Sequence, residues 1–133
     1  MKFLTDESTL FFLNRPENLA LWEDYLAPWL EFQFPEAQMI VQKTQITLKG
    51  RISFLAISIP PRKFVLRGQP AILVTFGLGR TIQWNRIVSS APISHNRITY
   101  HTLVRSPDDL DETLLEYLKE SWETASQGDY KSF

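Results

Sequence analysis

The spacing of apolar residues changes twice along this chain, and this change of period limits the possible folds more than any other feature. In residues 16–30, apolar side chains recur every three or four positions, which is typical of a helix with one buried face. From Gln38 to Val104 the period is two, which is typical of strands. After Ser106 the helical spacing returns. A run of strands bounded by helices indicates an α+β fold with an antiparallel sheet.

Two helices are predicted before the strands. The first lies within residues 5–14, where Asp6 and Glu7 place negative charge at its N-terminus. Its predicted core anchors are Leu10, Phe11 and Leu13. The second begins at Pro16, since proline suits the first helical position. Its predicted apolar stripe is Leu19, Trp22, Tyr25, Leu26, Trp29 and Leu30. Because Pro28 removes a helical hydrogen bond, a kink or an early end is expected near residues 25–28.

Five strands and a final helix follow. The strands are expected at residues 39–48, 52–59, 71–77, 81–88 and 97–104, and residues 62–70 and 91–96 are expected to be loops. Gly50 marks a turn, so the first two strands should form a hairpin. Ser106 and Pro107 are typical of a helix start, and Gly128 marks the end of the last helix.

These elements predict a single α+β domain spanning residues 1–133. An antiparallel sheet of about five strands forms one layer, and the N- and C-terminal helices pack on one of its faces as a two-layer sandwich. The opposite face of the sheet is then left free of helices.

Composition narrows the functional classes. The 14 Lys and Arg residues against 15 Asp and Glu give a net charge of −1, so a nucleic-acid partner is not expected, although a local basic face remains open. There is no cysteine, which removes thiol catalysis and cysteine-based metal sites. No signal pattern and no apolar run long enough for a membrane span occurs, so a cytoplasmic protein without membrane contact is predicted.

The free face of the sheet is the predicted binding site. Alternation along the strands places a set of polar side chains on it, namely Lys43, Gln45, Thr47, Thr75, Arg97 and His101. Lys43, Gln45, Arg97 and His101 are the predicted contacts to a small polar or anionic ligand, because cationic and amide groups donate hydrogen bonds to such ligands. Two alternatives stay open: an ordinary solvated face, and an interface with another protein or a second copy.

A smaller basic feature lies in the loop after the second strand. Arg62, Lys63 and Arg67 surround Phe64 there, a mixture that suits a phosphate group or nucleic acid. The alternative is a solvated loop held in place by Phe64.

No catalytic, metal or cofactor site is predicted. The two histidines, His95 and His101, are poorly spaced to share one ion, and the acidic cluster at residues 108–112 fits a helix N-terminus without metal. An enzyme with His101 as general acid or base is kept as an alternative, without a nucleophile to support it. A metal chaperone is the other alternative.

Four stretches resemble an uncharacterised bacterial family, domain of unknown function 5655. They are FFLNRPENLALWEDYL, VQKTQITLKGRISFLAISIP, WNRI with the proline-containing loop after it, and ITYHTLVRSPDDLDETLLEYLKESWETA. The resemblance implies a compact α+β domain with no established activity, and it matches Lys43, Gln45 and His101 to recurring positions of that family. The helix–strands–helix order is also similar to small iron-chaperone domains of the frataxin type, a similarity of layout that carries no function.

Overall fold

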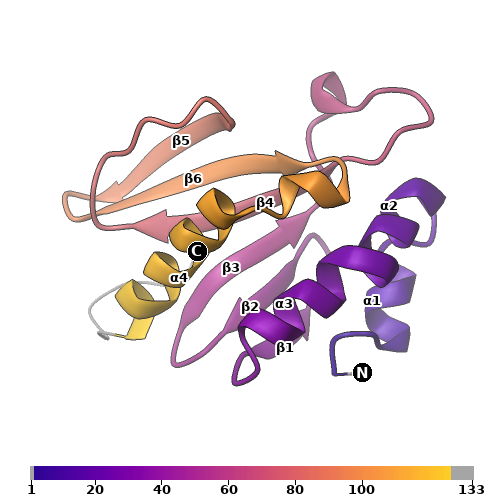
Figure 1. Ribbon diagram of the computed structural model, residues 1–133, viewed down its shortest axis with the longest axis horizontal. Helices are drawn as coiled ribbons and strands as arrows, with labels where there is room; N and C mark the ends of the chain where they lie inside the picture. Colours follow the sequence, from indigo (N-terminus) through magenta and orange to yellow (C-terminus); the bar gives the residue numbers. More distant parts are fainter. Residues whose placement is uncertain (1, 127–133) are drawn as a thin grey trace.

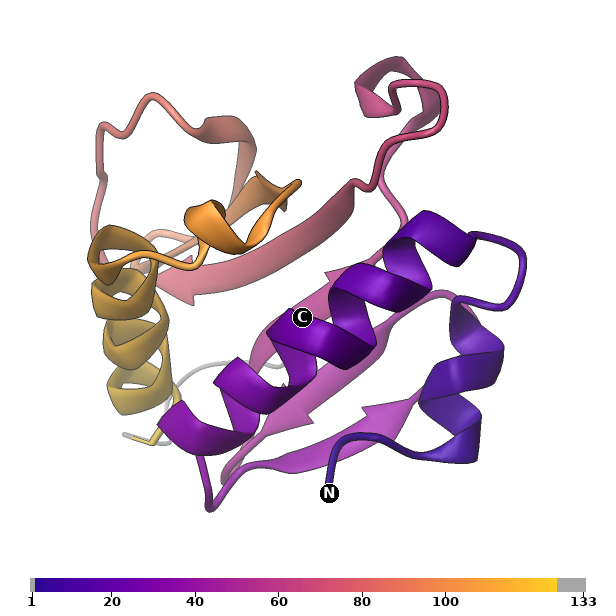
Figure 2. The same ribbon diagram turned by 45° about the vertical axis from the view of Figure 1, so that its right-hand side comes forward.

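The computed structural model describes residues 2–126 and has the predicted α+β architecture (Figure 1). The helices are α1 (Asp6–Phe11), α2 (Pro16–Leu21), α3 (Ala27–Gln33) and α4 (Glu112–Ser126), and the strands are β1 (Gln38–Val41), β2 (Ile46–Lys49), β3 (Ser53–Ser58), β4 (Ile72–Leu78), β5 (Ile87–Ser94) and β6 (Arg97–Val104). The strands form one antiparallel sheet in the order β1-β2-β3-β4-β6-β5. All four helices lie on the same face of the sheet, as predicted (Figures 1 and 2).

The sheet has six strands because the first predicted strand, residues 39–48, is divided in two. The backbone N–H of Gln42 donates to the carbonyl of Gln45 at 2.8 Å and closes a tight turn between β1 and β2. Residues 42–45 are all polar, so they have nothing to bury in the core and leave the ladder. Lys43 therefore lies on a turn and not on a strand, which corrects the expected alternation.

The predicted strand at residues 81–88 is also wrong. Residues 81–86 form a loop, and β5 begins only at Ile87 and continues through most of the expected loop at residues 91–96. Two contacts hold this loop on the helical side of the sheet. The rings of Trp84 and Tyr117 of α4 pack with their centroids 5.2 Å apart, and the N–H of Ile82 donates to the Tyr100 hydroxyl at 3.0 Å. β5 tolerates Pro92 because it is an edge strand.

The long N-terminal helix continues through Pro28. A π-helical turn, Trp22–Leu26, joins α2 to α3, and the N–H of Ala27 donates to the carbonyl of Trp22. The wider turn lies directly before the proline, whose ring would crowd a regular helical turn. Of the expected kink or early end, the early end is wrong, and Figure 2 shows one unbroken helix crossing the sheet.

The core lies between the sheet and the helices. Alternate residues of the central strands face it, and Leu55, Ile57, Val74 and Phe76 are fully buried or nearly so. Burying several such side chains contributes about 1.5–3 kcal/mol each to stability.

Two predicted anchors of α1 do not reach this core. Leu10 and Leu13 are 63% and 58% exposed. Phe12 is instead fully buried, and its ring packs against that of Trp22 with the ring centroids 5.7 Å apart. The capping box between Thr5 and Ser8 fixes the start of this short helix, and its buried face follows from that start.

The C-terminal helix begins later than predicted. Ser106 caps a short 3-10 turn, Pro107–Asp109, and α4 itself starts at Glu112. The predicted helix end at Gly128 lies outside the described residues. α4 packs across β3 and β4, where Ser121 and Leu118 are buried.

Candidate functional site

The face of the sheet opposite the helices is not covered by any helix of residues 2–126 (Figure 2). We call it the open face. The strand register aligns four of its residues in one row across the sheet: Thr47, Ala56, Thr75 and His101. Thr47, Ala56 and Thr75 are small and almost fully buried, at 5%, 3% and 7% exposure, and His101 is half-buried, so the imidazole is the main group that this row exposes.

His101 is the chemically versatile group of this row. Its Nδ1 lies 2.7 Å from the Thr75 hydroxyl oxygen, and burial lowers the pKa of the imidazole from its ordinary value of 6.5. The ring is therefore neutral at physiological pH, and Nε2 has no hydrogen-bond partner within residues 2–126. A neutral imidazole held at one nitrogen can donate to or accept from a polar group at the other.

Gln45 and Lys43 lie at the far side of the sheet from His101. The Gln45 amide donates to Thr47 Oγ1 at 2.8 Å, and Thr47 donates to Gln42 at 2.8 Å, so these side chains stabilise the β1–β2 turn. Three interstrand steps separate β2 from β6, which is roughly 14 Å between the backbones. Lys43 is exposed and lies farther still along the turn.

Arg97 lies at the other end of β6 from Val104. Its side chain is only 2% exposed, and a Cβ at Gly77 would come within 2.7 Å of Nε, so the guanidinium lies directly against the backbone of β4. Arg97 and His101 are four positions apart, which is roughly 13 Å along a strand. The structure thus places Gln45, Arg97 and His101 at three separate places and does not gather the predicted set into one cluster.

The distribution of charge along the chain supplies a different signal. Between Glu36 and Asp108 the sequence contains no Asp or Glu at all. The same stretch contains ten cationic residues: Lys43, Lys49, Arg51, Arg62, Lys63, Arg67, Arg80, Arg86, Arg97 and Arg105. Because this stretch forms the whole sheet and its loops, the sheet layer is basic and the helical layer is acidic.

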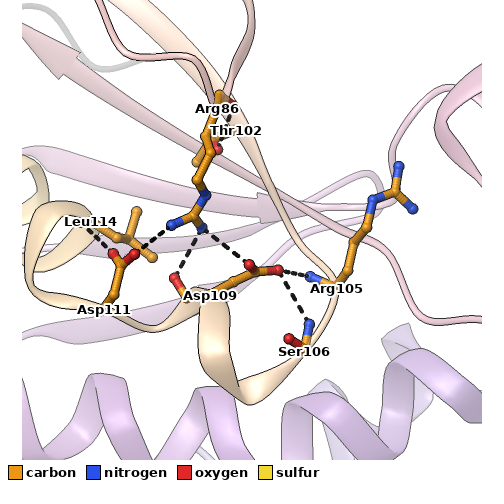
Figure 3. A network of polar contacts seen from close by, with 7 residues as sticks. All are labelled: Arg86, Thr102, Arg105, Ser106, Asp109, Asp111 and Leu114. Atoms are coloured by element: carbon orange, nitrogen blue, oxygen red, sulfur yellow. Dashed lines mark hydrogen bonds and ion pairs between the residues drawn. The ribbon is translucent and has the colours of Figure 1, made fainter.

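Two of these cations are neutralised by the C-terminal helical segment. Arg80 pairs with Glu120 at 3.0 Å, and Arg86 pairs with Asp111 at 2.9 Å and with Asp109 at 3.8 Å (Figure 3). The carboxylate–guanidinium contact also raises the pKa of Arg80.

Two carboxylates of the acidic cluster, those of Asp109 and Asp111, are occupied by structural contacts. Asp109 accepts hydrogen bonds from the backbone N–H groups of Arg105 and Ser106, and Asp111 accepts from that of Leu114 (Figure 3). Arg86 connects the two carboxylates. Within residues 2–126 no group of three His, Cys, Asp or Glu side chains is arranged to hold a metal ion.

A further group of cations gathers at one end of the sheet, and we call this group the basic rim. The register places the β1–β2 turn, the end of β3, the start of β4 and the end of β6 at this same end. The basic rim consists of Arg15, Lys43, Arg62, Lys63, Arg67 and Arg105. None of these side chains forms an ion pair with another residue of the described segment 2–126.

Sequence reasoning found part of the basic rim and missed two members. Arg62, Lys63 and Arg67 were recognisable from their loop, and the acid-free stretch that contains them would have marked Arg105 as well. Arg15 carries no local signal, since it belongs to the acidic N-terminal segment and reaches the rim only through the packing of α2 beside the loop after β3.

No protein-family model, curated protein or solved structure matches the chain. The resemblance to domain of unknown function 5655 therefore stays a prediction, and the functional proposal rests on the geometry and charge of the site. None of the helices among residues 2–126 has the length and apolar character needed to cross a bilayer.

Proposed function

We propose that this protein is a small binding module for an anionic ligand, which it contacts with the basic sheet layer and above all with the basic rim. The observation that carries this proposal is the separation of charge: ten cations and no carboxylate in residues 37–107, within a protein whose net charge is −1. A solvated surface alone needs no such separation, because mixed charges keep a protein equally soluble.

Electrostatics explains why the rim acts as a unit. At about 0.1 M salt the screening length is about 10 Å, so charges on neighbouring loops still reinforce one another. Summed potentials of this kind raise the local concentration of an oppositely charged ligand and speed its association. No carboxylate of the described residues forms an ion pair with a rim cation, so the acidic helices do not neutralise these cations by direct contact.

The open face adds neutral contacts to this charge. His101, whose Nδ1 contacts the buried Thr75 hydroxyl, presents a neutral imidazole, and the exposed Ser89 of β5 lies opposite it in the sheet. Such groups fix the orientation of a ligand by hydrogen bonds, while the cations supply attraction over a longer range.

A thermal-shift screen tests the proposal. The panel holds inorganic tripolyphosphate, a nucleotide, citrate and a sulfated sugar, with spermine as a polycation control. A ligand that binds only the folded chain stabilises it by about 2.7 kcal/mol at a hundred times its Kd. At least one polyvalent anion is expected to raise the melting temperature at low salt, and the rise should shrink as salt increases. The proposal fails when no anion raises it, or when spermine raises it as much.

A further inference from the structure

A hollow of about 320 Å³ lies within the basic rim, at the junction of α2 and the loop after β3. Four residues line it: Arg15, Pro60, Arg62 and Val65. Its lining therefore combines two arginine side chains with two apolar side chains, and most of the lining surface is apolar. This lining contains no carboxylate.

The two arginines come from distant parts of the chain. Arg15 is the residue before α2, and Arg62 begins the 3-10 turn Arg62–Phe64. Both side chains are exposed, and neither has a hydrogen-bond acceptor or an ion-pair partner among residues 2–126. Two like charges at one hollow repel each other, and an anion bound between them attracts both and offsets that repulsion. Glu17 lines a neighbouring hollow together with Arg15 but forms no ion pair with it.

Arg105 adds a third positive charge beside the same turn. Its Nη2 donates to the carbonyl of Phe64 at 2.7 Å, two residues from Arg62, while its Nη1 is buried without an acceptor in the described chain. Figure 3 shows that this side chain points away from Asp109 and Asp111. The guanidinium group of Arg105 therefore forms no ion pair with Asp109 or Asp111, and its positive charge lies at the rim.

We propose that this hollow binds a phosphoryl group of a small phosphorylated ligand, an inference that rests on the proposed function and names its ligand class. A phosphoryl group offers several oxygens in different directions, so two guanidinium groups can each bind it with paired hydrogen bonds. A single carboxylate has two oxygens and fills the paired geometry of only one guanidinium. The apolar walls, Pro60 and Val65, strengthen such contacts by excluding water from one side.

Isothermal titration with inorganic pyrophosphate and with ADP tests this site. Arg15→Ala and Arg62→Ala are each expected to weaken binding by about tenfold or more, since hydrogen bonds to charged groups contribute that much. Arg62→Lys keeps the charge without the paired donors, so its affinity should lie between that of the wild type and that of Arg62→Ala. Equal effects on both ligands mean that the phosphoryl group itself is recognised, while a loss seen only with ADP means that a nucleotide is required.

Arg51→Ala is the matched control. Arg51 is an exposed arginine in the β2–β3 turn, at the opposite end of the sheet, and its loss changes the net charge by the same amount. It should change the Kd by less than about twofold. Neither Arg15 nor Arg62 supports the fold through its side chain, so unchanged circular-dichroism melts are expected for both variants.

The outcomes separate this inference from the broader proposal. A loss in Arg51→Ala equal to that in Arg62→Ala overturns the phosphoryl site, because charge alone then explains binding. If pyrophosphate and ADP do not bind while citrate or the sulfated sugar does, the phosphoryl site is wrong and the anion-binding function stands. If none of these anions binds, both are wrong.

Discussion

At the scale of single residues, His101 shows how the same side chain changes its chemistry with its surroundings. Packing on the sheet beside Thr75 removes part of its hydration, and this burial lowers the pKa of the imidazole. The ring is more costly to protonate in the folded protein than in the unfolded chain. Stability must therefore depend on pH in the range where the unfolded histidine titrates.

The sign of that dependence gives a prediction. The unfolded chain binds more protons than the folded protein between the lowered pKa of His101 and 6.5, so stability is complete above 6.5 and is lost as pH falls through this window. His101→Asn removes the titrating group. We expect the variant to lose less stability than the wild type between about pH 7.5 and about pH 5.5, measured by urea denaturation.

The second histidine serves as the control for this measurement. His95 is exposed in the β5–β6 turn, and His95→Asn should follow the wild-type pH dependence. Equal losses in His101→Asn and in the wild type would show that burial of this imidazole has no energetic weight.

At the scale of elements, the docking of α4 on the sheet depends on one hydroxyl. Ser121 donates to the carbonyl of Phe54 in β3 at 2.6 Å and accepts from the N–H of Gly77 in β4 at 3.2 Å. The register of the β3–β4 ladder begins at the next pair, Leu55 and Phe76. The helix thus supplies the hydrogen bonds that the two strands do not make to each other at this point.

Removing that hydroxyl should be costly. Ser121→Ala leaves a buried carbonyl and a buried N–H without partners, which costs about 1–3 kcal/mol of unfolding free energy. Urea denaturation measures the loss, and hydrogen exchange at the Gly77 amide should become faster. Ser126→Ala, an exposed serine on the same helix, should change stability by less than about 0.5 kcal/mol. A Ser121→Ala variant as stable as this control would contradict the bridging role.

At the scale of the whole molecule, the two layers carry opposite charge. The acidic residues lie in the segments before residue 37 and after residue 107, and the cations concentrate in the sheet segment between them. A net charge of −1 is therefore the difference between two large opposite charges on two sides of the molecule. Whether a charged surface attracts or repels the protein therefore depends on which layer, basic or acidic, faces that surface.

Ion-exchange chromatography checks this separation. At about 10 mM salt the screening length is about 30 Å, so the protein should be retained by a cation exchanger at neutral pH despite its negative net charge. The double variant Arg67→Glu with Glu116→Arg exchanges charge between the layers and keeps the net charge. It should elute at lower salt. Retention unchanged by this exchange would mean that the basic rim is not what holds the protein.

The sequence by itself determined the α+β class, the antiparallel sheet and the placement of the helices, because hydrophobic period and burial on one face are local properties of the chain. It also contained the acid-free stretch of residues 37–107 that makes the sheet basic. The errors fall where tertiary contacts outweigh local pattern: the turn at Lys43, the loop held by Trp84 and the continuation of the long helix past Pro28.

Only the tertiary structure decided which polar groups meet. Strand alternation placed Gln45, Arg97 and His101 on one side but could not give strand order, and that order separates them across and along the sheet. The tertiary structure also brings residues together: Arg15 and Arg62, which are far apart in the sequence, line one hollow. Residues far apart in sequence become neighbours only when helix and sheet bury their apolar faces together.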